Sequence, residues 1–291
     1  MLFDEFAGAR VLGGAPFNVA RHLCGLGLDP LLVTRVGEDS AGTDALDEMA
    51  AAGLDTSGVQ RDPDYPTGRV RIIVAGAAHQ FEIPERQAYD YIDAGVARRA
   101  AVEARPAVTY WGTLAQRCDI SRLALSAVLD GVASVRVFDV NLRAPWYGVA
   151  PIARSFRAAD VVKLNRGELD RVSTMLGVGT TSETERVRRL IDFYALTTLV
   201  VTDGRDGISL TTSDGRVWRA HGPAVAVVDT VGAGDAATAA LVAGELLGWS
   251  VEESIERADA LARAICQIRG AVPTSNTFYE PFRRAWNVVA P

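Results

Sequence analysis

Short apolar runs alternate with stretches of helical periodicity from about residue 107 onward. Strands are predicted at 107–113, 135–141, 159–165 and 197–204, and helices at 119–130, 167–176 and 184–196. The strand-like runs are continuously apolar, which is typical of strands buried on both faces. The succession of strand and helix predicts an α/β fold with a doubly wound, mostly parallel sheet flanked by helices.

Residues 66–84 have a different pattern, in which apolar and polar positions alternate around a Gly-Ala-Ala turn. This pattern predicts a hairpin with one buried face. It follows a predicted strand at 31–37 and a helix at about 40–53. We interpret it as part of a small β-sheet lid, with strands at about 9–15 and 66–84, inserted into a single domain spanning 1–291. The apolar face of the lid requires a cover, which a homodimer partner or the closed active site would provide; a plain edge hairpin is the alternative.

The composition narrows the class of protein. The chain has 291 residues, 48% of them hydrophobic, and a formal net charge of −6. The acidic balance disfavours nucleic-acid binding, and no apolar run reaches the roughly 18 residues that a membrane helix needs. No secretory leader is visible at the N-terminus. The cysteines (Cys24, Cys118 and Cys266) are too dispersed for a disulfide framework or a zinc site, so a cytoplasmic location is expected.

The segment 227–248, VVDTVGAGDAATAALVAGELLG, carries the clearest chemical signal. A strand predicted over 224–229 leads into a turn, where Gly232 and Gly234 permit unusual dihedrals and a close approach to a ligand. The amides that begin the following helix would bind an anion, typically phosphate. Asp235 lies in the first helical turn. A carboxylate there suits phosphoryl transfer to a hydroxyl, because it can accept the hydroxyl proton while the amides stabilise the moving charge.

Two other interpretations of this segment are open. Asp235 could serve only as a helix-capping group stabilised by the helix dipole, although a capping residue normally precedes its helix. The spacing of Gly232, Gly234 and Ala237 also matches the dinucleotide fingerprint GxGxxG/A, which would indicate an oxidoreductase. That fingerprint normally opens its βαβ unit, whereas this copy lies near the end of the chain, and Asp235 would repel a pyrophosphate.

Four motifs together resemble one protein family. DTVGAGDA (229–236) resembles the C-terminal signature of the ribokinase-like (PfkB) carbohydrate kinases, and GGAPFNVARHLCGLG (13–27) resembles their N-terminal signature in its fructokinase-like form. FDVNLR (138–143) and KLNRGEL (163–169) are similar to intermediate family elements. The resemblance extends over nearly the whole chain and implies a ribokinase-like α/β domain covered by a β-sheet lid.

The resemblance implies an ATP-dependent sugar kinase of the fructokinase-like branch, which transfers the γ-phosphoryl group of ATP to a sugar hydroxyl. Asp235 would then be the general base. The implied anion hole consists of the amides of Gly232, Ala233 and Gly234. Arg143 would face the acceptor or the phosphates; a surface salt bridge is its alternative role.

The same resemblance implies the residues that bind the sugar. They are Asp4, Gly13, Gly14, Asn18 and Asn141. Glycines let a hydroxyl-rich ligand approach the backbone, and an amide side chain can both donate and accept hydrogen bonds. A Gly-Gly turn ahead of a helix is the alternative interpretation of 13–18. Further candidates for selecting the sugar are Arg71, Gln80, Glu82, Gln116 and Arg117.

The nucleotide-side residues implied by the resemblance are Asn165, Glu168, Thr202, Gly204, Gly207, Gly270 and Ala271. The implied cofactors are ATP, Mg²⁺ reached by Glu168 through water, and K⁺ at Asp229. Asn165 and Glu168 also fit a capping box at the start of a helix. Asp203 departs from the family, which often has a hydrophobic or basic residue at that position.

Two alternatives to a fructokinase are open. Family members usually begin with a full strand before the aspartate that Asp4 matches, whereas only three residues precede it here. Each buried backbone group left without a partner would cost roughly 1–3 kcal/mol. One alternative is therefore a non-catalytic sugar- or nucleotide-binding member of the fold. The other is a kinase for 2-keto-3-deoxygluconate, ribose or a nucleoside, which similar scaffolds process.

Overall fold

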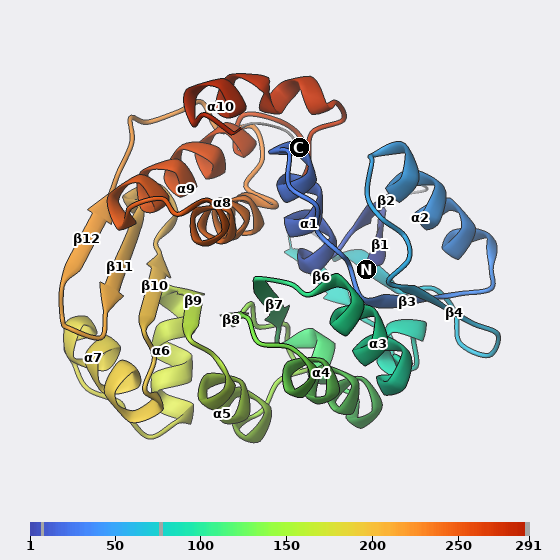
Figure 1. Ribbon diagram of the computed structural model, residues 1–291, viewed down its shortest axis with the longest axis horizontal. Coiled ribbons are helices and arrows are strands. Elements are labelled where there is room, and N and C mark those ends of the chain that lie inside the picture. The colour runs from blue at the N-terminus through green and yellow to red at the C-terminus, as the bar shows by residue number, and fades with distance from the viewer. Residues whose placement is uncertain (7–8, 76–77, 289–291) are drawn as a thin grey trace. The chain divides into compact units, whose positions relative to one another are not determined.

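The computed structural model describes residues 1–6, 9–75 and 78–288, with the side chains of residues 6, 9 and 72–81 outside the description (Figure 1). The chain divides into two compact units. The first comprises Met1–Arg105, Cys118–Val132 and Thr274–Pro291, and the second comprises Pro106–Arg117 and Ala133–Pro273. The candidate chemistry of 229–236 belongs to the second unit.

The described residues of the second unit form a six-stranded sheet in the order β12-β11-β10-β9-β8-β7. Its strands are β7 (Val108–Gly112), β8 (Val135–Asp139), β9 (Val161–Asn165), β10 (Thr198–Thr202), β11 (Ile208–Thr212) and β12 (Val217–Ala220). Strands β7 to β10 are parallel, whereas β11 and β12 extend the sheet in an antiparallel manner. The carboxyl ends of β8 and β9 therefore lie at the same edge of the sheet, where α/β proteins bind ligands.

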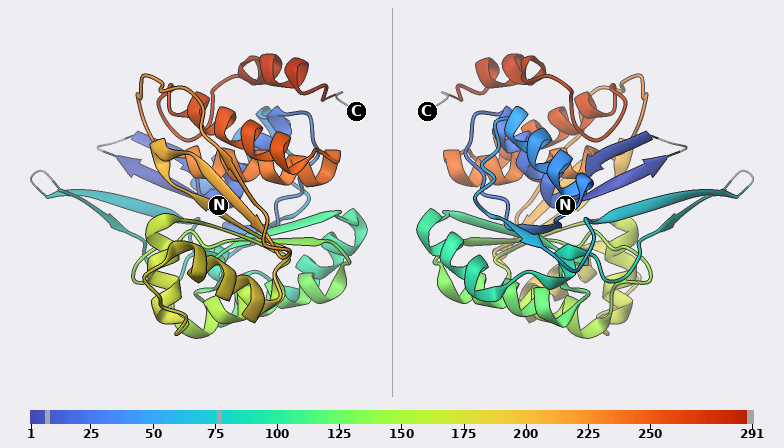
Figure 2. Two further views of the ribbon diagram at one scale, coloured as in Figure 1. Left: turned by 90° about the vertical axis from the view of Figure 1, so that its left-hand side faces the viewer. Right: turned by 90° about the vertical axis from the view of Figure 1, so that its right-hand side faces the viewer.

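Helices cover both faces of this sheet (Figures 1 and 2). One face carries α5 (Val149–Ala158), α6 (Arg166–Met175) and α7 (Glu183–Tyr194), and the other carries α8 (Ala233–Leu247) and α9 (Val251–Ile265). Strands enclosed in this way are predominantly apolar, and Phe138, Val162, Leu164 and Leu199 are fully buried. The predicted doubly wound α/β sheet is confirmed.

The strand predicted over 224–229 is wrong. Residues 221–230 form no strand, and Val227 and Val228 are each 61% exposed. The chain leaves the sheet after Ala220, and Pro223 lacks the amide needed to continue a ladder. The amide of Val228 instead donates to the carbonyl of Cys266, at 2.8 Å. A β-branched run without a neighbouring strand thus remains a loop.

The first unit has two smaller sheets among its described residues, one in the order β2-β1-β5-β6 and one pairing β3 with β4. The strands are β1 (Leu2–Phe6), β2 (Ala9–Gly13), β3 (Thr34–Gly37), β4 (Val59–Asp62), β5 (Arg69–Ala75) and β6 (Ala78–Glu82). The helices are α1 (Ala15–Gly25), α2 (Ser40–Ala51), α3 (Ala94–Ala104), α4 (Asp119–Gly131) and α10 (Glu280–Ala285). A core under the sheets includes Phe3, Leu12, Phe17, Val36 and Met49.

The predicted lid strands are part of the larger of these two sheets. Strands β5 and β6 pair as an antiparallel hairpin, from Arg71 opposite Glu82 to Ala75 opposite Ala78. The turn at 76–77 and the side chains of 72–81 lie outside the described residues, so the predicted one-sided burial stays a prediction. No helix within the described ranges combines the length and apolar character needed to cross a bilayer.

The strand that contains Asp4 is fully paired. Strand β1 pairs with β2 in an antiparallel manner and with β5 in a parallel manner, and Asp4 takes part in both pairings. Within the described residues, β7 pairs only with β8 and β3 only with β4. Asp4 therefore occupies a position fixed by two neighbouring strands.

Candidate active site

Helix α8 begins at the turn that the sequence singled out. Gly232 is the N-cap residue, with φ 80°, and Ala233, Gly234 and Asp235 form the first turn. A β-carbon on Gly232 would lie 2.5 Å from backbone atoms of Ala271. Glycine is therefore required at 232 both by the left-handed backbone and by the close approach of the 270–271 loop.

The first turn of α8 leaves backbone amides available for an anion. The first regular helical hydrogen bond runs from the Ala236 amide to the Gly232 carbonyl, at 2.9 Å. The amide of Gly234 precedes that bond and therefore has no intrahelical acceptor, whereas the amide of Ala233 donates to the Thr230 carbonyl at 3.4 Å. Since Gly232 occupies the N-cap position, Asp235 is not the N-cap residue, and it lies half-buried in the same first turn. The geometry matches an anion site with an adjacent base.

A buried ion pair lies beneath this turn. Lys163 on β9 is 6% exposed and Asp139 on β8 is fully buried. The Lys163 ammonium lies 3.2 and 3.1 Å from the two carboxylate oxygens of Asp139. Burial alone would lower the pKa of Lys163, but Asp139, Asp235 and Glu168 outweigh it and raise that pKa. Lys163 therefore stays positively charged.

Asn165 and Glu168 form the capping box that starts α6. The Glu168 amide donates to Asn165 Oδ1 and the Asn165 amide donates to Glu168 Oε2, each at 2.9 Å. The other carboxylate oxygen of Glu168 accepts the Leu142 amide at 2.7 Å. Burial raises the pKa of Glu168. The structural role considered for this pair is thus real, and Glu168 also holds the loop that follows β8.

The nucleotide-side residues on β10 and its turn lie next to this capping box. Thr202 is the register partner of Asn165 across β10 and β9. A 3-10 turn (Gly204–Asp206) follows, and Gly207, with φ 87°, lies so close to the Ala220 carbonyl that no side chain would fit. Asp203 forms an ion pair with Arg166, at 2.8 Å, which neutralises its charge.

Asp229 is fixed by backbone amides ahead of α8. Its two carboxylate oxygens accept the amides of Val231 and Gly270, at 3.1 and 3.0 Å. Burial would raise the pKa of Asp229, but these hydrogen bonds outweigh that effect and lower it. Asp229 thereby links the 270–271 loop to the start of α8.

Asn141 and Arg143 lie in the loop after β8, which ends at Asp139, two residues before the predicted end of that strand. Asn141 has a positive φ of 35°. Arg143 is exposed and donates to the Leu142 carbonyl at 3.1 Å, and among the described residues it forms no ion pair. The salt-bridge alternative for Arg143 therefore receives no support.

The predicted sugar residues of the first unit converge. A β-carbon on Gly13 would lie 3.0 Å from Asp4 Oδ2 and 4.0 Å from Asn18 Oδ1. Glycine at 13 therefore leaves space between a carboxylate and an amide, both suited to hydroxyl groups. Gly14, with φ 97°, is the N-cap residue of α1, so the predicted glycine turn before a helix is also present.

The further sugar-selecting candidates fall into two groups. Arg71 and Glu82 pair with each other across the hairpin at 3.8 Å, and the side chain of Gln80 lies outside the described residues. Gln116 is buried and donates to Ser155 at 2.7 Å, so it serves the core of the second unit. Arg117 stacks over the ring of Trp146.

Sequence reasoning missed three polar residues around Asp235. Asp139 and Lys163 have opposite charges within apolar strand sequences, and they are direct register partners on β8 and β9. Opposite charges inside neighbouring parallel strands could have indicated a buried pair. The hydroxyl of Tyr110 on β7 is buried and lacks a hydrogen-bond partner among the described residues. Burial, Asp139 and Asp235 raise the pKa of Tyr110 well above its usual value.

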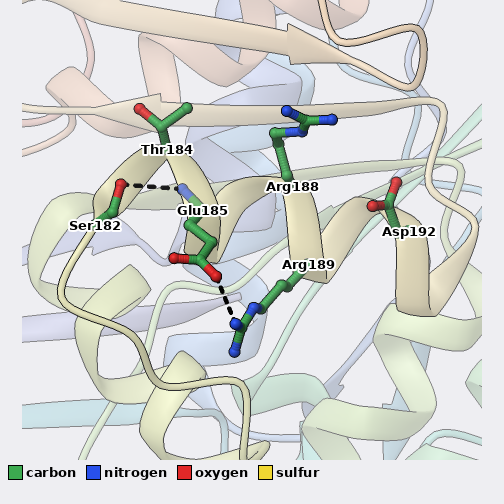
Figure 3. Close-up of a pocket in the computed structure, with 6 residues that line it drawn as sticks. All are labelled: Ser182, Thr184, Glu185, Arg188, Arg189 and Asp192. Carbon is green, nitrogen blue, oxygen red and sulfur yellow. Dashed lines mark hydrogen bonds and ion pairs between the residues drawn. The ribbon is translucent and has the colours of Figure 1, made fainter.

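A surface hollow at α7 is lined by residues that are not among the predicted site residues (Figure 3). It is lined by Ser182, Thr184, Glu185, Arg188, Arg189 and Asp192. Ser182 caps α7, and Glu185 pairs with Arg189, as the dashed lines show. Because these contacts are typical of a solvated helix surface, we assign the hollow no role in catalysis.

Comparisons with known proteins show the family of the chain. The chain matches the family model described as pfkB family carbohydrate kinase over residues 5–277. It is 26% identical to "Probable fructokinase-6, chloroplastic" of Arabidopsis thaliana, over 95% of this chain and 75% of that protein. It is also 26% identical to the 5-dehydro-2-deoxygluconokinase of Clostridium beijerinckii, over 87% of this chain and 77% of that protein.

A solved structure has the same fold. An uncharacterized sugar kinase from Pyrococcus horikoshii, in complex with ATP, aligns with a TM-score of 0.80 at 25% identity. The alignment covers 93% of this chain and 91% of that one. The ribokinase-like fold is thus confirmed. Because the family model spans residues of both units and includes the motifs at both ends of the match, the chain belongs to the pfkB family of carbohydrate kinases and is a phosphotransferase that acts on a sugar.

Proposed function

We propose that this kinase uses ATP to phosphorylate a hexose of the fructose type at a primary hydroxyl. The observation that carries the proposal is the start of α8, where Asp235 lies in the first turn directly after Gly234, whose amide has no intrahelical acceptor. A structural cap requires no such combination. An anion site next to a base is what transfer of a phosphoryl group to an alcohol needs.

In the proposed reaction, Asp235 accepts the proton of the sugar hydroxyl. The hydroxyl oxygen forms a bond to the γ-phosphorus of ATP as the bond to the ADP oxygen breaks. The amides of Gly232, Ala233 and Gly234 stabilise the negative charge on the moving phosphoryl group. Removing one preorganised donor of this kind typically costs about 3 kcal/mol in transition-state stabilisation. Arg143, exposed at the end of β8, adds positive charge for the acceptor or the phosphates.

The residues fit a magnesium ion held through water. Mg²⁺ usually keeps several waters and binds one or two carboxylates together with substrate phosphates. Both oxygens of Glu168 already accept backbone amides, but a carboxylate has about four lone-pair sites, so each oxygen can accept a further bond from a metal-bound water. The described residues contain no group of three or more His, Cys, Asp or Glu that could hold a metal. Bound with ATP, the ion would neutralise charge on the phosphates.

The remaining nucleotide residues complete this proposal. We assign nucleotide contacts to Asn165, Thr202, Gly204, Gly207, Gly270 and Ala271. Asp229 remains ionised because its pKa is lowered, and it therefore suits a monovalent cation such as K⁺ beside the 270–271 loop. The ion would strengthen the link between that loop and the start of α8.

Fructose is proposed as the acceptor on the basis of two sequence motifs and of the polar residues that converge in the first unit. GGAPFN and DVNLR are similar to the fructokinase-like branch. Asp4, Gly13 and Asn18 converge, and Gly14 begins α1 beside them, so these residues can bind several sugar hydroxyls. The relatives named fructokinase and 5-dehydro-2-deoxygluconokinase are equally similar to this chain. A keto-deoxy sugar acid is therefore the second acceptor to test.

The proposal includes a homodimer through the lid and a cytoplasmic location. The sheet β2-β1-β5-β6 offers the lid surface, on which Val11 is 50% exposed. A partner subunit would cover such a residue. The three cysteines are free thiols, in keeping with a reducing compartment.

The direct test is coupled ADP release over a panel of fructose, 2-keto-3-deoxygluconate, ribose and a nucleoside. We expect the highest kcat/KM with fructose, and a reaction without sugar provides the background rate. Turnover only with another sugar would change the acceptor and leave the kinase assignment intact. A folded protein that binds ATP but phosphorylates none of the panel would contradict the proposal and favour a non-catalytic binding protein.

A further inference from the structure

We infer that Lys163 is a positioning residue of the transfer site, whose buried ammonium group supports the first turn of α8 and balances the charge of Asp235. This inference rests on the proposed role of Asp235 as the base. Lys163, Asp139 and the first turn of α8 all belong to the second unit.

The first observation is the network that ties the two strands to the helix. Asp139 accepts both contacts from Lys163, and the Thr238 hydroxyl of α8 lies 3.1 Å from Asp139 Oδ2. The same hydroxyl lies 2.9 Å from the Gly234 carbonyl oxygen. Its single proton is shared between these two acceptors. Thr238 therefore connects the buried pair to the residue that precedes Asp235.

The second observation is the proximity of Lys163 to Gly234. A β-carbon on Gly234 would lie 3.2 Å from the Lys163 ammonium nitrogen, closer than ordinary van der Waals contact. Gly234 lies in a regular helical turn and is not among the glycines with positive φ, so the backbone conformation does not require glycine there. The need for glycine comes instead from the ammonium group packed against the turn.

The third observation is that Lys163 and Asp139 are charged residues in the core, where apolar residues could provide similar stability. Lys163 lies between Asp139 on β8 and Val200 on β10. A buried ion pair is often no more stabilising than apolar residues of similar volume. The two neighbouring positions on the same face, Val137 and Val161, are apolar and register partners. The pair at 139 and 163 therefore serves a function other than filling the core.

The charged groups near Asp235 indicate the function of the buried pair. Lys163 interacts electrostatically with Asp139 on β8, Glu168 on α6 and Asp235 on α8. Tyr110 interacts with Asp139, Asp235 and Arg143, which follows β8. Three carboxylates share a largely buried region in which Lys163 is the buried cation. Without that cation, mutual repulsion would favour protonation of a carboxylate. Lys163 thus keeps Asp235 ready to accept a proton.

The test compares pH–rate profiles of four variants with the wild type. Lys163→Met removes the cation alone, and Lys163→Met with Asp139→Asn removes both charges, so that the double variant has no lone buried charge to unfold the protein. We expect kcat to fall about tenfold or more in both, and the acidic limb of the profile to move to higher pH by roughly one unit in Lys163→Met but by less in the double variant, because loss of the Asp139 charge acts in the opposite direction. Lys163→Arg keeps the charge but crowds Gly234, so kcat should fall while the limb stays in place. Thr238→Val removes the bridge and should likewise leave the limb in place.

Two results decide the matter. A folded Lys163→Met variant with an unchanged acidic limb would overturn the inference, whether or not kcat falls, because a purely structural role predicts a lower kcat with an unmoved limb. An unchanged kcat in the folded double variant would also overturn it. Carboxyl-carbon NMR titration of Asp235 in the wild type, in Lys163→Met and in the double variant gives the same comparison without turnover. Failure of the kinase assay in the wild type is therefore distinguishable from failure of this inference.

Discussion

At the scale of single residues, Gly232 and Gly234 both precede Asp235 at the start of α8, but glycine is needed at the two positions for different reasons. Gly232 has a left-handed backbone and packs against Ala271, whereas Gly234 is helical and packs against the Lys163 ammonium. Substitution at 232 would therefore strain the backbone itself. Substitution at 234 would displace a charged group, with consequences for the reaction and not primarily for folding.

Gly234→Ala is expected to lower kcat about tenfold while changing the free energy of unfolding little. The added β-carbon must displace the ammonium group or tilt the first turn, which separates the amides from the phosphoryl group. Alanine is itself favoured in helices, so stability has a compensating gain. Steady-state kinetics and urea unfolding measure the two effects.

Gly179→Ala is the matched control for this substitution. No heavy atom lies within 4 Å of a β-carbon at Gly179, and its φ is not positive. We expect unchanged kcat and unchanged or slightly higher stability, since alanine restricts the unfolded chain. Equal kcat values for Gly234→Ala and the wild type would contradict the described contact with Lys163.

The motif residues of the site could be predicted from the sequence, but their supporting contacts could not. Local sequence patterns predicted that Asp235 lies in the first turn of a helix and that Asn165 and Glu168 begin another helix. The contact of Lys163 with Gly234 joins residues distant in the chain and depends on the β8–β9 register. Such register is set by tertiary packing, which a local pattern does not specify.

At the scale of elements, the described helices begin either with or without a side-chain cap. Side chains cap α2, α3, α6, α7 and α9, through Asp39, Asp93, Asn165, Ser182 and Ser250. Helices α1, α4, α5, α8 and α10 begin without one, and α8 begins at Gly232, which has no side chain to accept a hydrogen bond from the first turn. An uncapped first turn favours an anionic ligand in place of a capping oxygen.

Asn165→Ala should lower the free energy of unfolding by about 1 kcal/mol, because it removes the capping oxygen of α6. It should also lower kcat/KM for ATP, since Asn165 is proposed to contact the nucleotide. Ser182→Ala at the cap of α7 is the control, with a similar or smaller loss of stability and unchanged kinetics. Chemical denaturation and ATP-dependent kinetics distinguish the two. Parallel kinetic losses in both variants would mean that Asn165 acts only through folding.

The elements of the second unit were largely predictable because burial on both faces makes their strands distinctly apolar. Strands β7 to β10 begin and end within two residues of their predicted ends. The false strand at 224–229 has the same residue types but no neighbour to pair with. Pairing partners are a property of the sheet, so composition alone could not exclude that strand.

At the scale of the whole molecule, the candidate residues are divided between the two units. Asp4, Gly13, Gly14 and Asn18 belong to the first, and the remaining assigned residues, including Asp235, belong to the second. The family model spans residues of both. A kinase must bind two substrates; Asp4, Gly13, Gly14 and Asn18, proposed for the sugar, lie in the first unit, whereas Asn141 and the residues proposed for the phosphates lie in the second. Substitutions in the two units should therefore affect different kinetic constants.

The most direct measurement is kcat for Asp235→Asn with the preferred sugar of the panel, alongside calorimetric binding of ATP and of that sugar. Asparagine preserves size but cannot accept the hydroxyl proton as a carboxylate does. The account predicts nearly unchanged dissociation constants and a kcat lower by about 10²–10⁴. Asp214→Asn, at an exposed turn, should leave both unchanged. A kcat for Asp235→Asn within a few-fold of the wild type would contradict the assignment of Asp235 as the base.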